Sequence, residues 1–235
     1  MSKTGSLILS IDTTSRRGSV AVARAGRVAA LFGLEAETQQ SAMLWTDVDL
    51  ISRRLGIRFD EITAFAVVRG PGAFTGVRVG IAAALGFARA TGKPLFGATS
   101  LELTARAAGP GCPVRVALNA YRNEVYTQAF VIDAGTPVAL DAPSVEAPED
   151  VFRRLGAGPL RLVGSGIDAY RDALGERDGW TVVPTPAFLA GELASFTAER
   201  LAEGHAPDLV EPCYVRPSEA EVNLKRGLLG VSRIP

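Results

Sequence analysis

The feature that most constrains the fold is an order of predicted strands and helices that occurs twice along the chain. In residues 1–108, apolar runs and helical periodicity predict strand, strand, strand, helix, strand, helix, strand, helix. A similar order follows the segment GPGCP at 109–113, which has the composition of a boundary. We therefore expect a duplicated α/β architecture with an N-terminal domain at residues 1–108 and a C-terminal domain at 109–235.

Local patterns place the elements of each half. The first half is predicted to hold strands at 6–14, 18–24, 26–34, 64–68 and 94–98, with helices at 38–56, 77–92 and 101–108. A capping box of Thr99 and Glu102 opens the third of these helices. The second half is predicted to hold strands at 114–118, 124–132, 136–146, 160–164 and 181–183, with helices at 148–156, 165–175 and 187–204. The last stretch, NLKRGLLGVSRIP, shows no clear period and is either a frayed tail or a docking segment.

Composition excludes several classes of protein. Hydrophobic residues make up 47% of the chain and charged residues 21%, which indicates a folded globular protein. The formal net charge is zero, so no basic face for holding RNA by counterion release is expected. Two scattered cysteines and one histidine make a zinc or iron site unexpected, and we predict no metal. No signal peptide or membrane span is recognised at the N-terminus, so a cytoplasmic location is expected.

The order strand, strand, strand, helix, strand, helix, twice over, is the plan of the actin-like sugar kinase and Hsp70 ATPases (the ASKHA fold), which is our predicted fold class. In that plan the first hairpin holds phosphate, and SIDTTSRRGSVAV fits the role. Asp12 could hold a magnesium-bound water, while Thr13, Thr14 and Ser15 could donate to phosphate oxygens. The alternative is an ordinary turn in which Asp and Thr side chains bond their own backbone.

The segment RGPGAFTGVRVG, at 69–80, carries four glycines and a proline between two apolar segments. Its glycines lead into a helix for which Thr75 is the predicted cap, and Arg69 and Arg78 add positive charge. Such a loop could approach an anion, although the spacing is neither that of a P-loop nor G-x-G-x-x-G. The alternative is a tight connection from strand to helix without a ligand.

Within the helix that follows, small residues recur every four positions, at Gly76, Gly80, Ala84 and Ala88. A ridge of small side chains lets another helix approach closely. The neighbour could belong to the same domain or to another subunit.

The second half lacks matching phosphate-binding parts. Its hairpin, ALNAYRNEVY, has Asn119 where an acid would be expected and no glycine in the turn. The only candidate for a glycine-rich adenosine loop is VGSGID at 163–168, and a lone G-x-G is weak. Read physically, the chain resembles half of an ATPase.

Five stretches carry a resemblance to a known family: LILSIDTTSRRGSVAV, FAVVRGPGAFTGVRVGIAAALGFARATGKPLFGATSLE, NEVYTQAF, LVGSG and EPCYVRP. They resemble the TsaB (YeaZ) family, the dimerisation subunit of the bacterial tRNA threonylcarbamoyladenosine machinery. RGPGAFTGVRVG is the most specific of them, and the resemblance is weak from about Gly135 to Leu189.

The resemblance implies a catalytically inactive paralogue of TsaD, the metal-bearing subunit that transfers threonylcarbamoyl to an adenosine next to the anticodon. It implies binding to TsaD through the first domain, recruitment of the small ATPase TsaE, a homodimer when alone, and tRNA contact only through the complex. It implies no cofactor of the chain's own, with ATP or ADP possible in a pocket shared with partners. It favours a subunit interface over a phosphate or nucleotide contact. The interface residues are Gly72, Phe74, Thr75, Gly76, Arg78, Val79, Gly80, Ala83, Ala84 and Phe87. The residues of the possible phosphate or nucleotide contact are Asp12, Thr13, Thr14, Ser15 and Arg69.

The chain also departs from the family pattern. Many members have a His-Ser pair where this chain has Gln40-Ser41, and many have an aspartate at the position of Asn119. Both departures argue against chemistry at those positions, and no catalytic residue is predicted. Two other functions remain open: an ATP-dependent small-molecule kinase of the same fold, with Asp12 as the metal-site acid, and a peptidase, for which we find no supporting constellation. The scaffold reading predicts that Gly80→Arg abolishes dimerisation but leaves the monomer folded.

Overall fold

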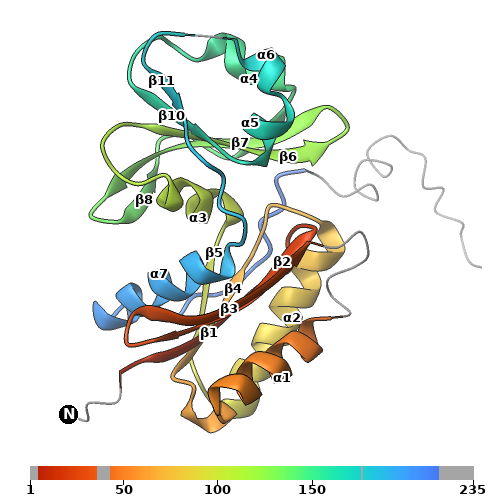
Figure 1. Cartoon of the computed structure of the whole chain (residues 1–235), viewed down its shortest axis with the longest axis vertical. Helices are drawn as coiled ribbons and strands as arrows, with labels where there is room; N and C mark the ends of the chain where they lie inside the picture. The colour runs from red at the N-terminus through yellow and green to blue at the C-terminus, as the bar shows by residue number, and fades with distance from the viewer. Residues whose placement is uncertain (1–4, 36–42, 176, 217–235) are drawn as a thin grey trace, which may run out of the picture.

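The computed structural model describes residues 5–35, 43–175 and 177–216, which form two β-sheets with helices above, below and between them (Figure 1). The first sheet has the strand order β3-β2-β1-β4-β5. Strands β1, β2 and β3 form the predicted antiparallel meander, and β1, β4 and β5 run parallel. The bounds are β1 Leu7–Asp12, β2 Arg17–Arg24, β3 Arg27–Glu35, β4 Ala64–Val68 and β5 Leu95–Ala98.

The second sheet repeats this plan, with the strand order β11-β10-β6-β7-β8 and β9 paired to β7. Its strands are β6 Val114–Tyr121, β7 Glu124–Asp133, β8 Thr136–Ala139, β9 Ser144–Glu146, β10 Leu160–Val163 and β11 Trp180–Val182. The helices that accompany it in the second half are α4 Pro148–Arg154, α5 Ser165–Ala169 and α6 Arg171–Leu174. The duplicated order that the sequence predicts is therefore present in space.

Strand β1 shows why both faces of the first sheet are covered. Leu7, Leu9 and Ile11 point to one face, where α1 (Leu44–Leu55) and α2 (Phe74–Thr91) pack, while Ile8 belongs to a separate core on the other face. Successive side chains of a strand alternate between faces, so an unbroken apolar run needs cover on both. Each fully buried Leu or Ile contributes about 1.5–3 kcal/mol relative to exposure.

The last helix of each half packs against the sheet of the other half. Helix α7 (Ala190–Ala202) covers the face of the first sheet opposite α1 and α2, and α3 (Ser100–Ala107) packs on the second sheet (Figure 1). The Ser10 hydroxyl donates to the carbonyl of Ala190 at 2.7 Å, which ties α7 to β1. The division at residues 108 and 109 stays a prediction, because each of these two helices packs on the sheet of the other half.

Element ends follow the local signals closely. Gly56 and Gly92 end α1 and α2 in left-handed conformations with φ of 63° and 68°, as glycine at a helix C-terminus does. The capping box is confirmed: the Thr99 hydroxyl accepts from the amide of Glu102 at 3.0 Å, and the Glu102 carboxylate accepts from the amide of Thr99.

Four local predictions were wrong or incomplete. Helix α2 begins at Phe74 with Ala73 as its N-cap, so Thr75 lies inside the first turn and does not cap it. The segment predicted as one strand at 136–146 forms β8 and β9, and the helix predicted at 165–175 divides into α5 and α6 at Tyr170. A short 3-10 helix at Phe59–Glu61 was not predicted. Gln40-Ser41 and the tail beyond residue 216 lie outside the described residues.

Candidate functional site

The glycine-rich loop packs against the turn between β1 and β2 of the same chain. The amide of Ala73 donates to the carbonyl of Thr14 at 2.7 Å. A Cβ added at Gly72 would lie 2.2 Å from that same carbonyl oxygen, which is far inside van der Waals contact. Glycine is therefore required at position 72 because backbone meets backbone there.

The small residues of α2 receive the same turn. The Thr13 hydroxyl donates to the carbonyl of Gly76 at 2.7 Å, and a Cβ at Gly76 would lie 1.9 Å from the Thr13 carbonyl oxygen. A Cβ at Gly80 would lie 2.4 Å from the Thr13 hydroxyl. Ala84 and Ala88 continue the ridge into the core of the first sheet. The neighbour of Gly76 and Gly80 is therefore the β1–β2 turn of the same domain, while Ala84 and Ala88 face the core.

This packing divides the residues predicted to form a subunit interface. Gly80, Ala83 and Ala84 are buried within the chain, so their side-chain positions are not on the outer face of α2. Four of the remaining positions are partly buried, namely Gly72, Gly76, Val79 and Phe87. Only Phe74, Thr75 and Arg78 of the predicted set are exposed. The interface stays a prediction, and it needs the outer face of α2 rather than the small-residue ridge.

Asp12, at the end of β1, is the buried acid of the turn. Its side-chain oxygen Oδ1 accepts from the Thr14 amide at 2.9 Å and from the Thr14 hydroxyl at 2.7 Å. Burial raises the pKa of the Asp12 carboxyl to about 6, and these two hydrogen bonds oppose the shift. A buried acid with a raised pKa marks a functional candidate, but its bonding matches the alternative of an ordinary turn.

Of the other predicted phosphate contacts, Ser15 bonds within the turn through its hydroxyl, and Arg69 bonds through its backbone carbonyl. The Ser15 hydroxyl accepts from the amide of Arg17 at 3.1 Å. The Arg69 carbonyl accepts from the amide of Cys213 at 2.7 Å. Burial raises the pKa of the Cys213 thiol, and the nearby Arg69 charge partly opposes this shift. Contact of the Ser15 hydroxyl and the Arg69 guanidinium with phosphate or nucleotide stays a prediction.

In the second half, the equivalent turn is closed by its own side chains. The side-chain oxygen of Asn119 accepts from the backbone amide of Tyr121 at 2.8 Å. The backbone amide of Asn119 donates to the Ser165 hydroxyl at 3.0 Å. A Cβ at Gly164, where φ is +119°, would lie 2.3 Å from the carbonyl oxygen of Ala117. The G-x-G of VGSGID therefore serves a close strand-to-helix connection.

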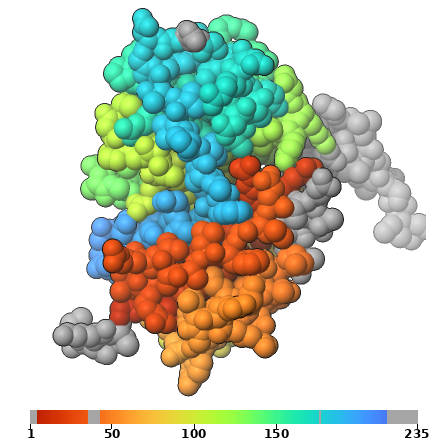
Figure 2. All heavy atoms as spheres, viewed as in Figure 1, coloured from red at the N-terminus to blue at the C-terminus, as the bar shows by residue number. Residues whose placement is uncertain are grey.

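The two turns meet across the seam, by which we mean the boundary between the two sheets with their helices. The guanidinium of Arg16 lies 5.8 Å from the centre of the Tyr121 ring. Figure 2 shows the red atoms of the β1–β2 turn meeting the green atoms of the β6–β7 hairpin there. The sequence-predicted sites of the two halves are thus brought together in space.

The sequence analysis missed a set of residues near the C-terminal end of the described chain, although EPCYVRP was part of the resemblance. Tyr214 stacks on Phe74 with ring centres 5.0 Å apart, and its hydroxyl oxygen accepts from Arg78 Nε at 2.8 Å. Arg216 forms an ion pair with Glu124 of the β6–β7 hairpin. No local pattern could have indicated these contacts, because they join residues far apart in sequence.

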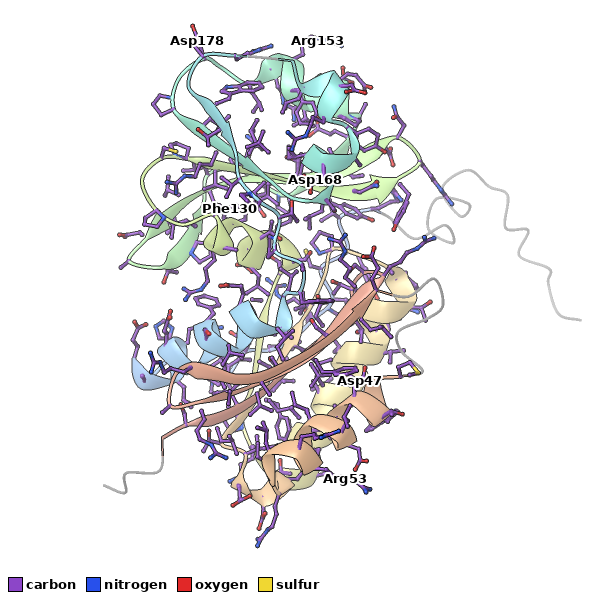
Figure 3. The ribbon with its side chains drawn as sticks, in the orientation of Figure 1. Asp47, Arg53, Phe130, Arg153, Asp168 and Asp178 are labelled. Carbon is purple, nitrogen blue, oxygen red and sulfur yellow. The ribbon has the colours of Figure 1, made fainter. Side chains whose placement is uncertain are left out.

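Surface hollows and metal-ligand groupings add little to this picture. Two hollows of about 320 and 840 Å³ lie around α6 in the second half, near Arg153 and Asp178 in Figure 3, and neither touches the glycine-rich loop. Among the described residues, no three His, Cys, Asp or Glu side chains come close enough to hold a metal ion. No helix in the described ranges is long and apolar enough to cross a membrane.

Comparison with known proteins identifies several relatives. A family model described as TsaD, tRNA N6-adenosine threonylcarbamoyltransferase, matches residues 34–158. The tRNA threonylcarbamoyladenosine biosynthesis protein TsaB of Escherichia coli (strain K12) is 32% identical over 226 residues, which cover 91% of this chain and 96% of that protein. The Haemophilus influenzae protein of the same name is 34% identical, covering 69% of this chain and 73% of its own length.

A solved structure described as YeaZ from Pseudomonas aeruginosa is 26% identical, with a TM-score of 0.76. The match covers 89% of this chain and 99% of that one. The similarity therefore extends over both sheets and well beyond the glycine-rich loop.

Proposed function

The chain belongs to the TsaB (YeaZ) family of tRNA threonylcarbamoyladenosine biosynthesis proteins, and from this premise we propose that it is a non-catalytic scaffold subunit of that machinery. It takes part in making this tRNA modification in the cytoplasm. In the proposed role it supports threonylcarbamoylation of the adenosine next to the anticodon in tRNAs that read codons beginning with A. It binds the catalytic TsaD-type subunit and helps to recruit a TsaE-type ATPase.

The observation that carries the non-catalytic part of the proposal is the bonding of the β1–β2 turn. Asp12, Thr13 and Thr14 direct their polar side-chain atoms at one another and at the backbone of α2. A turn that serves a nucleotide would offer these atoms to phosphate or to a metal-bound water. At the opposite turn, Asn119 bonds within its own hairpin in the same way.

Two further parts of the proposal concern ligands and partners. Any ATP or ADP is held in a pocket shared with a partner, and a contact from Asp12 to Ser15 or Arg69 then requires the turn to exchange its internal hydrogen bonds for bonds to the nucleotide. The outer face of α2, at Phe74, Thr75 and Arg78, is the proposed contact with the catalytic subunit or with a second copy of the chain. Binding of tRNA is left to the assembled complex.

Reconstitution tests the proposal. The chain is combined with the TsaD-type and TsaE-type subunits of its own source, a tRNA transcript and a threonylcarbamoyl adenylate donor, and modified adenosine is quantified. We expect modification to depend on the chain, and we expect the chain alone to transfer nothing and to hydrolyse no ATP. ATP turnover by the chain alone, abolished by Asp12→Asn, would instead support the kinase alternative and contradict the scaffold proposal.

A further inference from the structure

The segment Glu211–Arg216, called the strap below, follows α7 and runs from the first sheet to the second (Figure 1). Val210, just before it, is buried in the core between the first sheet and α2. Val215, near its end, packs against the core of the second sheet. The strap is therefore anchored in both halves by side chains that are only five residues apart.

Its attachment to the first half involves exposed side chains of α2. The Arg78 guanidinium lies 3.7 Å from the centre of the Phe74 ring, which stacks on the Tyr214 ring at an interplanar angle of 29°. The hydrogen bond from Arg78 Nε to the Tyr214 hydroxyl oxygen closes this group of three. Cation–π and aromatic contacts of this kind hold a segment to a helix without burying it.

Arg216 adds an electrostatic attachment to the apolar contact that Val215 makes with the second half. Arg216 pairs with Glu124 at the start of β7, and its guanidinium lies 5.6 Å from the centre of the Tyr126 ring. Both partners belong to the hairpin that also meets Arg16 across the seam. Arg216 thus joins the strap to the β6–β7 hairpin, which meets the β1–β2 turn at Tyr121.

The glycine-rich loop is shaped to accept the strap. Gly70 has φ of +96°, and a Cβ there would lie 2.9 Å from the carbonyl oxygen of Cys213. The adjacent Arg69 carbonyl accepts the Cys213 amide. The loop therefore holds the strap on one side and the β1–β2 turn on the other.

We propose that the strap is a latch that couples the outer face of α2 to the relative position of the two sheets. Phe74 and Tyr214 are 39% and 44% exposed, and Arg78 is exposed, so a docked subunit can cover all three without displacing Tyr214. Docking on this face then favours the latched arrangement. Coupling between two sites is reciprocal: if docking favours the latched arrangement, the latched arrangement favours docking, so loss of the latch at its far end is expected to weaken docking.

Arg216→Ala tests the latch, because Arg216 contacts the second half and not α2. We expect faster hydrogen exchange at the Cys213 amide, by about tenfold or more, in the chain alone. The affinity for the TsaD-type subunit, measured by titration calorimetry, is expected to fall about fivefold or more. This second readout rests on the proposed function, whereas the first does not.

Arg154→Ala is the matched control, since Arg154 also pairs with a glutamate, Glu146, but lies wholly within the second half. We expect it to change neither readout. Tyr214→Phe, which keeps the ring and removes only the hydroxyl, serves if Arg216→Ala does not fold, and it is expected to accelerate exchange at Cys213 in the same direction.

Unchanged exchange at Cys213 in the variants, or a change equal to that in Arg154→Ala, would overturn the latch. Faster exchange with unaltered subunit affinity would overturn the coupling. Failure of the wild-type chain to bind the subunit would instead count against the proposed function and the coupling that rests on it, while the exchange readout would still decide the latch.

Discussion

Thr13 and Gly76 hold the β1–β2 turn against the start of α2. The Thr13 hydroxyl donates to the Gly76 carbonyl at 2.7 Å, and the Thr13 carbonyl oxygen occupies the space that a Cβ at Gly76 would need. Contact this close requires glycine at position 76. This glycine of RGPGAFTGVRVG is therefore needed for packing within the chain, in addition to any role of the segment at the surface.

Gly76→Ala is expected to lower the free energy of unfolding by about 1–3 kcal/mol, because the new methyl group forces the turn away from α2. Gly86→Ala is the control on the same helix, since Gly86 is exposed and nothing lies within 4 Å of its Cβ position. It should raise stability by up to about 1 kcal/mol through helix propensity. Urea unfolding measures both, and equal stabilities for the two variants would contradict the packing described for the turn.

The interface on α2 is best tested at Thr75, which is exposed. Thr75→Arg is expected to weaken self-association or binding to the catalytic subunit while the melting temperature stays within a few degrees of wild type. Gly80→Arg is no longer expected to leave the monomer folded, because Gly80 is buried against Thr13. Light scattering with a thermal melt distinguishes the two variants. Undiminished association of a folded Thr75→Arg chain would rule out this part of the face.

Asp12 gives the stability of the chain a pH dependence. Its pKa is about 6 in the folded chain and 3.8 for an ordinary aspartate, so the folded state holds the proton more tightly. The resulting contribution is fully present below about pH 4 and is lost as the pH rises through about 6, by about 2–3 kcal/mol in all.

Asp12→Asn removes this dependence while keeping an oxygen that can accept from Thr14. We expect the variant to match wild type near pH 4 and to exceed it above pH 6, in urea unfolding across that range. Asp49→Asn, at an exposed acid of α1, serves as the control. A stability difference for Asp12→Asn that does not vary with pH would show that burial of the charge is not its cause.

Arg106 links α3 to α7, the two helices that each pack on the sheet of the other half. Its side chain is 13% exposed, bonds Glu199 of α7 at 2.7 Å and lies over the Phe196 ring. Arg106→Ala is expected to cost about 1–3 kcal/mol, because it removes the contact with the Phe196 ring and the hydrogen bonds to Glu199 and to the Gly135 carbonyl. Arg53→Ala, which breaks an exposed pair on α1, should cost less than about 0.5 kcal/mol. Similar costs for the two in thermal unfolding would mean that α3 and α7 are held by apolar packing alone.

The sequence by itself determined the actin-like fold class and most of the elements, because these depend on local signals. Continuous apolar runs made β1 and β4 buried strands, and glycines ended α1 and α2 in the left-handed region that glycine tolerates. Recognition of RGPGAFTGVRVG also identified the family. The glycines in that segment indicated close contact, but not the group that makes it.

Only the tertiary structure decided what lies against those glycines. A ridge of small residues looks the same in sequence whether a partner helix or a turn of the same domain packs on it. Here Thr13 of the β1–β2 turn packs on Gly76 and Gly80. The crossing of α3 and α7, and the bond between Arg78 and Tyr214 across 136 residues, likewise depend on the order of strands in the sheets. The period of apolar or small residues along an element indicates that one of its faces is buried. Which group packs on that face depends on how the whole chain packs.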